Sequence, residues 1–422
     1  MNFKASGKNF IIMVICQIAS IFGSAILRFA FSLYVLDVTD SAILFALILA
    51  ISSIPGLVFS PVGGAIADRF DRRKLMILLD FISCAVTLVV VFLYYFNKNN
   101  DLPLIVIAVV MTVLLFVIAM YQPIVQASIP VLVGSENLAG ANGIVSSVNA
   151  LSQFAAPALG GVLYGFIGLG NIIIISAAAF FISAVVLMMF FRIPFKKPQS
   201  NRNIIPTIVD DIKEGAKYVS KEKPYLLRTI ILATALNLFL MPLFLIGAPY
   251  LLRNIMLASD IEYGFGIAVA YLSTIAAALF IGFFVKRMSM RTLYKPFIVV
   301  AFLMIPMAIA PSNWFLKLGH YPPYFTFIIF AIPIVMIVTI VSIYATTYIQ
   351  KETPNHLLGK VMAIVLAVGQ CATPFGQIIY GWILDAFKNE EFIPLGIASA
   401  ITFIMAFVAK ILLKSNPERK IG

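Results

Sequence analysis

Two charged residues lie inside long apolar segments of this sequence, where a charge is costly. Arg28 lies about eighteen residues into the apolar run 10–35, hence roughly 27 Å from its start at 1.5 Å per helical residue. Asp80 lies near the start of a second apolar run, 74–96. A guanidinium in hydrocarbon needs water, a partner or a ligand, and an isolated carboxyl there can carry a proton. Movement of protons and solutes is the chemistry that such residues could perform.

Each of these charges also has a structural interpretation. Arg28 could be a strut to Asp37, near the far end of the same segment, or to backbone carbonyls. The sequence does not choose between the strut and a ligand-binding role. Asp80 could carry a proton, but pairing with the basic residues just before it is the favoured interpretation. Asp37 is the second candidate for proton coupling.

Uncharged polar residues share a helical face with Arg28. Gln17, Ser20, Ser24 and Ser32 recur with it at steps of three and four residues. A polar stripe on an otherwise apolar helix predicts that this face lines a wet cavity. Any single residue of this kind can instead hold two helices together through a hydrogen bond.

Further polar stripes lie on the apolar segments 141–166 and 360–384. On another segment, Asn237 and Met241 precede Pro242, where a broken hydrogen-bond ladder often marks the side that faces a cavity. Taken together, the stripes predict a cavity with adaptable apolar contacts. The predicted substrate-binding residues are Gln17, Ser24, Arg28, Phe31, Asn149, Gln153, Asn237, Met241, Gln370 and Gln377.

The segments that carry these residues are too apolar for a water-soluble protein. Of the 422 residues, 62% are hydrophobic and 11% are charged, and the mean hydropathy is +1.03. Apolar windows of about twenty residues, the length of a membrane-spanning helix, recur about twelve times. The sequence therefore predicts an all-α membrane protein with twelve transmembrane helices. The windows lie at 10–35, 42–66, 74–96, 103–126, 141–166, 171–191, 226–250, 263–285, 296–315, 323–346, 360–384 and 393–413.

The net charge of +12 reflects orientation in a membrane and not a nucleic-acid partner. Most Lys and Arg residues fall in alternate loops between the predicted helices, and cytoplasmic loops are the ones enriched in these residues. Because the number of helices is even, both termini are expected in the cytoplasm. The expected environment is the lipid bilayer, and no nucleic acid is expected to bind.

A polar stretch divides the predicted helices into two sets of six. We expect an N-terminal six-helix bundle at 1–191, a cytoplasmic linker at 192–225 and a C-terminal six-helix bundle at 226–422. Thr207 and Asp210 resemble a capping box at the start of an amphipathic linker helix. Short motifs recur at corresponding places in the two halves, which predicts two pseudo-symmetric bundles.

The sequence contains no pattern that indicates an enzyme, a metal site or a cofactor. The 3 cysteines fall inside apolar windows, and the 2 histidines lie in loops without a second ligand nearby. The phosphate-binding pattern Gly-x-x-x-x-Gly-Lys-Ser/Thr is absent. We therefore expect no catalytic residue, no metal, no cofactor and no use of ATP.

The loop between the second and third apolar windows carries the most specific motif of the chain. From Gly64 it reads Gly-x-x-x-Asp-Arg-x-x-Arg-Arg, with Asp68, Arg69 and Arg72 at polar positions. The glycine lets two helices approach closely, and the basic residues keep the loop on the cytoplasmic side. Between two membrane helices, this motif resembles the signature loop of the major facilitator superfamily.

From Asn9 onward, the chain is similar to the branch of that superfamily that contains macrolide-efflux proteins and the enterobactin exporter. Besides the signature loop, the likeness rests on Asp80 and on segments within 129–142 and 211–224. The resemblance implies that the first, fourth, seventh and tenth helices line a central cavity. It also implies two six-helix bundles that rock about this cavity.

The resemblance assigns gating roles to several residues. Asp68 would grip the start of the eleventh helix near Leu358 and hold the outward-open state. Pro157 lies in a segment that resembles the bending motif of drug and proton antiporters. One departure is that the fourth helix has no arginine near Leu114, where relatives tie one to proton coupling. The implied gating residues are Gly64, Asp68, Arg69, Arg72, Pro157 and Gly161.

These observations predict a monomeric secondary transporter in a bacterial cytoplasmic (inner) membrane. It would export amphipathic small molecules, such as drugs, macrolide-like compounds or natural products, by proton antiport and alternating access. Asp80 and Asp37 are the candidates for proton coupling. Because Arg28 would leave one positive charge in the cavity, neutral or anionic molecules should be preferred to lipophilic cations. The alternatives are an exporter of an anionic siderophore or lipid-like metabolite, and a transporter-derived immunity or sensor protein without net transport.

Overall fold

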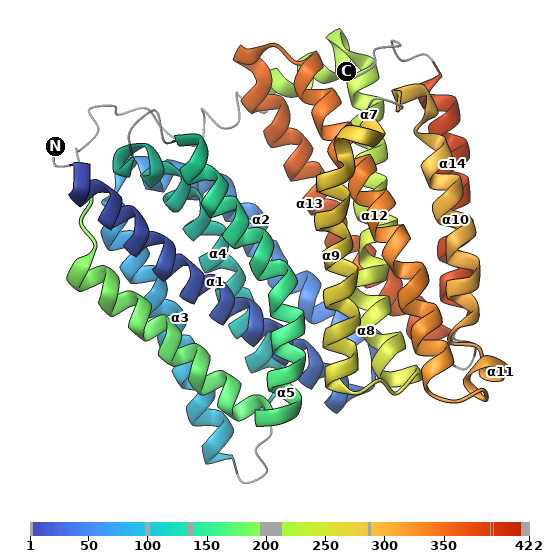
Figure 1. Ribbon diagram of the computed structural model, residues 1–422, viewed down its shortest axis with the longest axis horizontal. Helices are drawn as coiled ribbons and strands as arrows, with labels where there is room; N and C mark the ends of the chain where they lie inside the picture. Colours follow the sequence, from blue (N-terminus) through green and yellow to red (C-terminus); the bar gives the residue numbers. More distant parts are fainter. Residues whose placement is uncertain are drawn as a thin grey trace. The chain divides into compact units, whose positions relative to one another are not determined.

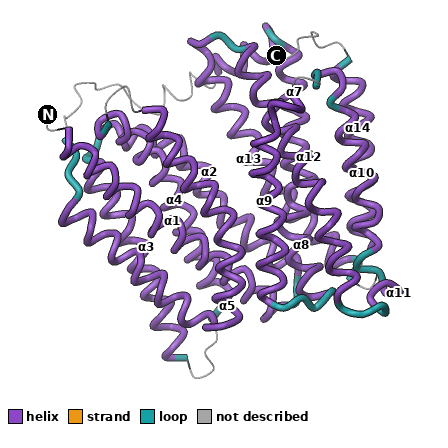
Figure 2. The backbone as a smooth tube through the Cα atoms, in the orientation of Figure 1, coloured by secondary structure: helices purple, strands orange, loops and turns teal. Residues whose placement is uncertain are grey.

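The described part of the chain is helical throughout. Figure 1 shows the protein as a computed structural model, and Figure 2 marks helices and loops but no strand in the described residues. The predicted all-α membrane fold is confirmed. The structure describes residues 3–97, 102–133, 138–194, 213–285, 288–388, 390 and 392–414.

The first half of the chain forms long apolar helices. Its helices are α1 (Phe3–Thr39), α2 (Ala42–Arg69), α3 (Arg72–Phe96), α4 (Leu104–Leu132) and α5 (Leu138–Phe190). The last of these contains two of the predicted windows, because its backbone leaves helical geometry at Gly168, where φ is 73°. Glycine adopts this left-handed conformation without the steric penalty of a side chain. The kink at Gly168 therefore turns one continuous segment into two helices.

The second half begins with a segment that alternates α-helical and π-helical turns around Pro242. Proline cannot donate a backbone hydrogen bond, and the ladder shifts its register on both sides of it. The parts of this segment are η2 (Tyr218–Glu222), α7 (Pro224–Ala235), η3 (Leu236–Leu240), η4 (Leu243–Gly247), α8 (Ala248–Tyr250) and η5 (Leu251–Ile255). The remaining helices are α9 (Asp260–Val285), η6 (Met290–Thr292), α10 (Tyr294–Ile309), α11 (Asn313–Leu316), α12 (Tyr321–Glu352), α13 (Asn355–Ala386) and α14 (Phe392–Leu413).

Helices lie over all of the predicted windows. Among the described residues, 10 helical segments are long and apolar enough to cross a membrane by length and composition. One window was placed too far along the chain, because α10 ends at Ile309 and the window was expected to reach residue 315. Pro311 follows that end, and a proline has no backbone N–H with which to continue the helical hydrogen-bond ladder.

The chain divides into two compact units. Unit 1 comprises Met1–Val38 and Ile51–Ile204, and unit 2 comprises Thr39–Ala50 and Ile205–Gly422. The first turns of α2 therefore group with unit 2, although the sequence placed all of α2 in the N-terminal bundle. The expected bundle limits at 191 and 226 remain predictions.

The described end of the expected linker is amphipathic. Gly215, Tyr218 and Val219 are buried, whereas the residues between them are exposed. An added Cβ at Gly215 would lie 3.1 Å from the carbonyl oxygen of Lys360 on α13, so this glycine permits a close approach of the two helices. The proposed capping residues Thr207 and Asp210 lie outside the described residues.

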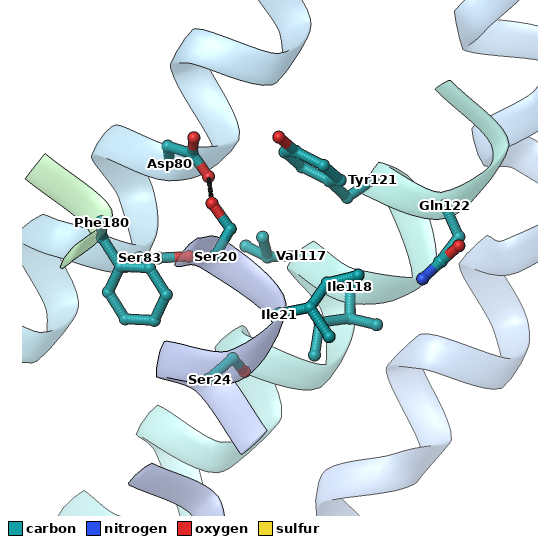
Figure 3. A pocket seen from close by; sticks show the side chains of 10 residues that line it. All are labelled: Ser20, Ile21, Ser24, Asp80, Ser83, Val117, Ile118, Tyr121, Gln122 and Phe180. Atoms are coloured by element: carbon teal, nitrogen blue, oxygen red, sulfur yellow. Dashed lines mark hydrogen bonds between the residues drawn. The ribbon is translucent and has the colours of Figure 1, made fainter. Parts of the chain in front are cut away.

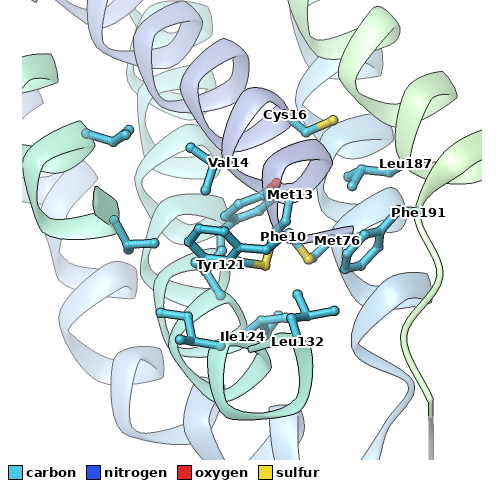
Figure 4. Packing of buried hydrophobic residues seen from close by; sticks show 14 of the residues in the cluster. Phe10, Met13, Val14, Cys16, Met76, Tyr121, Ile124, Leu132, Leu187 and Phe191 are labelled. Atoms are coloured by element: carbon cyan, nitrogen blue, oxygen red, sulfur yellow. The ribbon is translucent and has the colours of Figure 1, made fainter. Parts of the chain in front are cut away.

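The core of unit 1 is a cluster of apolar side chains at one end of its helices. Phe10 and Met13 from α1 pack with Met76 from α3, Tyr121 from α4 and Leu187 from α5 (Figure 4). Each of these side chains is at most 8% exposed. The cluster fixes α1 against three other helices and so positions its polar face.

A glycine fixes the approach of α13 to the broken helix of unit 2. A Cβ built at Gly376 would overlap the carbonyl oxygen of Leu238 and would lie 2.5 Å from Cγ of Pro242. The Leu238 carbonyl is available at this point because Pro242, four residues later, has no N–H to donate to it. Only glycine fits between these two backbones.

We therefore predict that Gly376→Ala destabilises the protein by about 1–3 kcal/mol, the usual range for overpacking. The measurement is thermal unfolding of the purified protein in detergent. Gly396→Ala on α14 is the matched control, because nothing lies within 4 Å of the added methyl group there. Equal melting temperatures for the two variants would contradict the packing argument.

Candidate functional site

The carboxyl group of Asp80 lies at the centre of a polar cluster inside unit 1. Its side chain is 1% exposed. Ser20 on α1 donates a hydrogen bond from Oγ to Asp80 Oδ1 at 2.7 Å, and Ser183 on α5 donates to Oδ2 at 2.5 Å. Figure 3 shows Asp80 and Ser20 facing each other between α3 and α1. Three helices from distant parts of the sequence therefore meet at one carboxyl group.

The basic residues at the start of α3 do not pair with this carboxyl. Arg72 donates from Nη1 to the carbonyl oxygen of Ala127 at 2.8 Å, and Arg73 donates to the carbonyls of Leu187 and Met188. Among the described residues, the hydrogen-bond partners of Asp80 are the two serines. Arg72 and Arg73 therefore do not anchor Asp80, because they satisfy backbone carbonyls instead. The side chain of Arg69 lies outside the described part, so an anchor through Arg69 remains a prediction.

A small cavity adjoins the Asp80 carboxyl. Its volume is about 10 Å³, which is close to the least that can hold one water molecule. The cavity reaches from the acid along α1 to Ser24 and across to Gln122 on α4 (Figure 3). Its polar lining residues are Ser20, Ser24, Asp80, Ser83, Tyr121 and Gln122.

The polar face of α1 contains several buried groups without partners. Gln17 is 0% exposed, and among the described residues neither its amide nitrogen nor its amide oxygen has a hydrogen-bond partner. The hydroxyl of Ser24 and Nε of Arg28 are buried and unpartnered in the same way. Leaving such a group unsatisfied costs about 1–3 kcal/mol each. Polar groups kept in this condition mark a place where water or a ligand can bind.

The predicted strut between Arg28 and Asp37 is not formed. Nε of Arg28 is buried and has no hydrogen-bond partner among the residues that the structure describes. Tyr164 donates its hydroxyl to Asp37 Oδ2 at 2.9 Å, and Asp37 is exposed. Of the two roles left open for Arg28, the ligand-binding role is favoured over the strut to Asp37, because Asp37 is bonded to Tyr164.

Other predicted contacts of unit 1 have different surroundings. Phe31 is 0% exposed and belongs to the packed interior. The amide of Asn149 pairs with that of Gln122, with hydrogen bonds of 2.6 and 3.2 Å. This pair brings Asn149 to the edge of the cavity beside Asp80, since Gln122 lines it. The side chain of Gln153 lies outside the described part.

In unit 2, the predicted pair Asn237 and Met241 lines a separate cavity of about 50 Å³. Thr229 and Ser342 add hydroxyl groups to its wall. This cavity lies among α7, η3, α10 and α12. The two predicted glutamines of α13 do not line it: Gln370 is exposed, and Gln377 is 7% exposed with a buried, unpartnered amide oxygen.

The predicted gating residues are described unevenly. The side chains of Asp68 and Arg69, the surroundings of Gly64 and those of Pro157 lie outside the described part. Gly161 is buried in α5. Its neighbour Gly160 packs on α1, since an added Cβ would lie 2.7 Å from Cδ1 of Phe29. The proposed grip of Asp68 near Leu358 remains a prediction.

Sequence reasoning missed an acidic cap in unit 2. Asp385 accepts hydrogen bonds from the Ser41 hydroxyl at 2.7 Å and from the backbone N–H groups of Ala42 at 2.8 Å and Ile43 at 3.2 Å. A carboxylate at a helix N-terminus is stabilised by these free N–H groups and by the helix dipole. Gly381 allows the approach, since its added Cβ would lie 2.6 Å from Cβ of Ala46.

A signal for this cap was present in the sequence. Asp385 follows Gly381 by four residues, which is the spacing of Asp68 after Gly64 in the signature loop. Both acids lie at the end of a long apolar helix, and at Gly381 the glycine permits a close approach. The repeated spacing alone would have directed attention to Asp385.

Comparisons with known proteins agree with this architecture. Relatives of the chain include "Macrolide efflux protein A" of Streptococcus pyogenes, which is 25% identical over 374 residues and covers 87% of each chain. A protein of the same name from Enterococcus faecalis is 25% identical over 328 residues, covering 76% of this chain and 95% of that one.

Solved structures of transporters share the fold. The nucleoside transporter NupG aligns with a TM-score of 0.72 and 14% identity, covering 99% of this chain and 100% of that one. A D-xylose–proton symporter aligns with a TM-score of 0.71 and 14% identity, covering 97% and 98%. The family model described as Major Facilitator Superfamily matches residues 13–376. The chain is therefore a membrane transporter protein that belongs to the Major Facilitator Superfamily.

Proposed function

We propose that this transporter exports amphipathic small molecules from the bacterial cytoplasm by proton antiport and alternating access, with both termini in the cytoplasm and a single chain as the working unit. Two macrolide-efflux proteins among the relatives support export of amphipathic cargo. The observation that carries proton coupling is the Asp80 carboxyl, buried in unit 1 and held by two serine hydroxyls.

The surroundings of Asp80 suit a group that gains and loses a proton. Serine hydroxyls can donate to a carboxylate and can accept from a carboxylic acid, so both forms can be satisfied in place. Without a cationic partner, burial disfavours the ionised form, whereas the two donated hydrogen bonds favour it. These opposing effects keep both forms accessible. One proton that crosses 100 mV supplies about 2.3 kcal/mol for export.

Arg28 favours neutral or anionic cargo over cations. Its buried Nε has no partner, and it shares a helical face with the unpaired Gln17 and Ser24. A charge-assisted hydrogen bond to an anionic group would satisfy the guanidinium and add geometric specificity. This observation supports a second candidate function, export of an anionic siderophore or lipid-like metabolite.

The remaining predicted residues have supporting roles in this proposal. Asn149, Gln153, Asn237, Met241, Gln370 and Gln377 would contact cargo in other stages of the cycle. Phe31 would contribute by packing. Gly64, Asp68, Arg69, Arg72, Pro157 and Gly161 would act in gating. We add Asp385 to the gating group, because its cap on α2 joins the ends of two long helices.

We predict that Asp80→Asn abolishes proton-driven accumulation of transported probes in inside-out vesicles. The reason is that an asparagine amide does not gain and lose a proton near neutral pH. Erythromycin, taurocholate and tetraphenylphosphonium serve as probes, with and without an imposed pH gradient. In the Asp80→Asn variant, exchange of a probe between the inside and the outside of the vesicle should continue when no pH gradient is imposed. Asp37→Asn is the matched control, since Asp37 is the exposed alternative.

Full gradient-driven accumulation by Asp80→Asn would contradict the assignment of the proton site. Loss in Asp37→Asn alone would move the site to that residue. Binding of a probe without any accumulation by the wild-type protein would favour an immunity or sensor function. Accumulation that ignores both the pH gradient and an uncoupler would exclude proton antiport.

We predict that Arg28→Gln lowers transport of taurocholate, a permanent anion, by about tenfold or more, because a hydrogen bond to a charged group contributes about 1.5–3 kcal/mol. Transport of the permanent cation tetraphenylphosphonium should not fall. Arg28→Lys, which keeps the charge, is the control. A lower melting temperature and poor insertion, with unchanged preference between the two probes, would show a structural strut instead.

A further inference from the structure

Ser183 on α5 lies within hydrogen-bond distance of three oxygens on two other helices. Its hydroxyl is 2.5 Å from Asp80 Oδ2 on α3, 3.1 Å from Ser20 Oγ on α1 and 3.3 Å from the carbonyl oxygen of Cys16 on α1. A serine hydroxyl has a single hydrogen, so it can donate to one of these acceptors at a time. The side chain is 1% exposed, so solvent does not compete for that hydrogen.

The protonation state of Asp80 decides which acceptor is used. When Asp80 is ionised, Ser20 donates to Oδ1 and Ser183 donates to Oδ2, and the charge is best satisfied. When a proton binds to Oδ2, that oxygen becomes a donor and its nearest acceptor is Ser183 Oγ. The hydrogen of Ser183 must then turn away from the acid. On α1, Ser20 Oγ at 3.1 Å and the Cys16 carbonyl oxygen at 3.3 Å are within its reach, and the backbone carbonyl is the stronger acceptor of the two.

Both arrangements leave every member of the cluster satisfied. In the neutral state, Asp80 donates to Ser183, Ser183 donates to Cys16, and Ser20 still donates to Asp80 Oδ1. No group moves except hydrogens, and the bound proton remains on the carboxyl. The same positions of the non-hydrogen atoms therefore allow both hydrogen-bond patterns, one for ionised Asp80 and one for neutral Asp80.

The new acceptor lies in the turn of α1 that carries the polar face. In an α-helix, the carbonyl of Cys16 accepts from the N–H of Ser20, four residues later. A second hydrogen bond to that carbonyl shares its lone pairs and weakens the helical one. Gln17, whose buried amide has no partner, lies in the same turn. Protonation of Asp80 therefore changes the hydrogen bonding of the backbone carbonyl next to Gln17.

The titratable groups that face Asp80 do not offer a competing route. The thiol of Cys16 on α1 and the hydroxyl of Tyr121 on α4 both interact electrostatically with the acid. Neither is basic, and among the described residues no Lys, Arg or His forms a hydrogen bond or ion pair with Asp80. On α5, the group that faces the acid is the hydroxyl of Ser183. Ser20 links the acid to α1 through a side chain, and the Ser183 hydroxyl adds a link to the α1 backbone at Cys16.

We propose that Ser183 is a positioning residue for coupling: its hydroxyl donates to Asp80 when the acid is ionised and to the Cys16 carbonyl when the acid is protonated. The proposal rests on the proposed function, because it takes Asp80 as the site of the transported proton. It adds the step by which that proton alters the cargo-facing turn of α1.

Infrared spectroscopy can test this switch directly, because the chain has only 3 cysteines. Cysteine labelled with ¹³C at its carbonyl, in a Cys84→Ala, Cys371→Ala background, isolates the Cys16 carbonyl band. As pH falls, we expect a protonated carboxyl band to appear. The Cys16 carbonyl band should move to lower frequency with the same midpoint, because that carbonyl gains a hydrogen bond.

Three variants separate the switch from its neighbours. Asp80→Asn identifies the carboxyl band by removing it. In Ser183→Ala, the carboxyl band should still titrate while the carbonyl band stays fixed, and Ser183→Thr, which keeps a hydroxyl, should restore the shift. Ser20→Ala is the matched control: it removes the other hydroxyl on Asp80 and should leave the carbonyl shift in place.

The failures of the two proposals are distinguishable. A carboxyl band that titrates in the wild-type protein while the Cys16 band does not move would overturn the switch and leave the proton site intact. A carbonyl shift that persists in Ser183→Ala would also overturn it. If Asp80→Asn removes no titrating carboxyl band, Asp80 is not the proton site. The proposed role of Ser183 is then wrong as well.

Discussion

The structure depends on a carboxyl group that is buried among membrane helices and held by two serine hydroxyls. A full charge at this place would need a partner, and the described part of the chain provides Asp80 with hydroxyls and no cation. Hydroxyl groups can serve either protonation state, whereas an arginine would fix the ionised one. The apolar core beside it includes Met13 and Met76, which are fully buried.

The same reasoning connects the acid to the face of α1 where cargo is proposed to bind. Ser20 lies between Gln17 and Ser24 on that helix, and it contacts Asp80 directly. Arg28 lies two turns farther along the same face. The proton site on α3 therefore touches the helix that carries the candidate cargo residues of unit 1. Coupling between them needs no long-range pathway, because Ser24 and Arg28 lie one and two helical turns from Ser20.

The fold was largely predictable from the sequence, and the site was predictable only in part. Apolar windows of membrane length identified the helices, and single residues such as Gly168 and Pro311 decided where they end. Arg28 and Asp80 stood out because a charge in hydrocarbon is costly wherever it points. Composition and spacing therefore reveal the charges that a membrane protein must accommodate.

What those charges touch could not be predicted, because their partners lie on other helices. Ser183 is a small residue in an apolar helix, more than one hundred positions from Asp80, and nothing local marks it as a partner. The arginines next to Asp80 in sequence seemed the natural partners, yet they bind carbonyls that also come from distant helices. Proximity along the chain was a poor guide to the partners of these charges, because packing between distant helices determines them.

The most direct test of the account is proton release when cargo binds, measured with a pH indicator in weakly buffered solutions of the purified transporter. If a proton on Asp80 opposes cargo binding, then cargo must expel that proton by the same coupling free energy. Taurocholate or erythromycin should release up to about one proton per chain from the wild-type protein and none from Asp80→Asn. Equal release from both proteins would contradict the account.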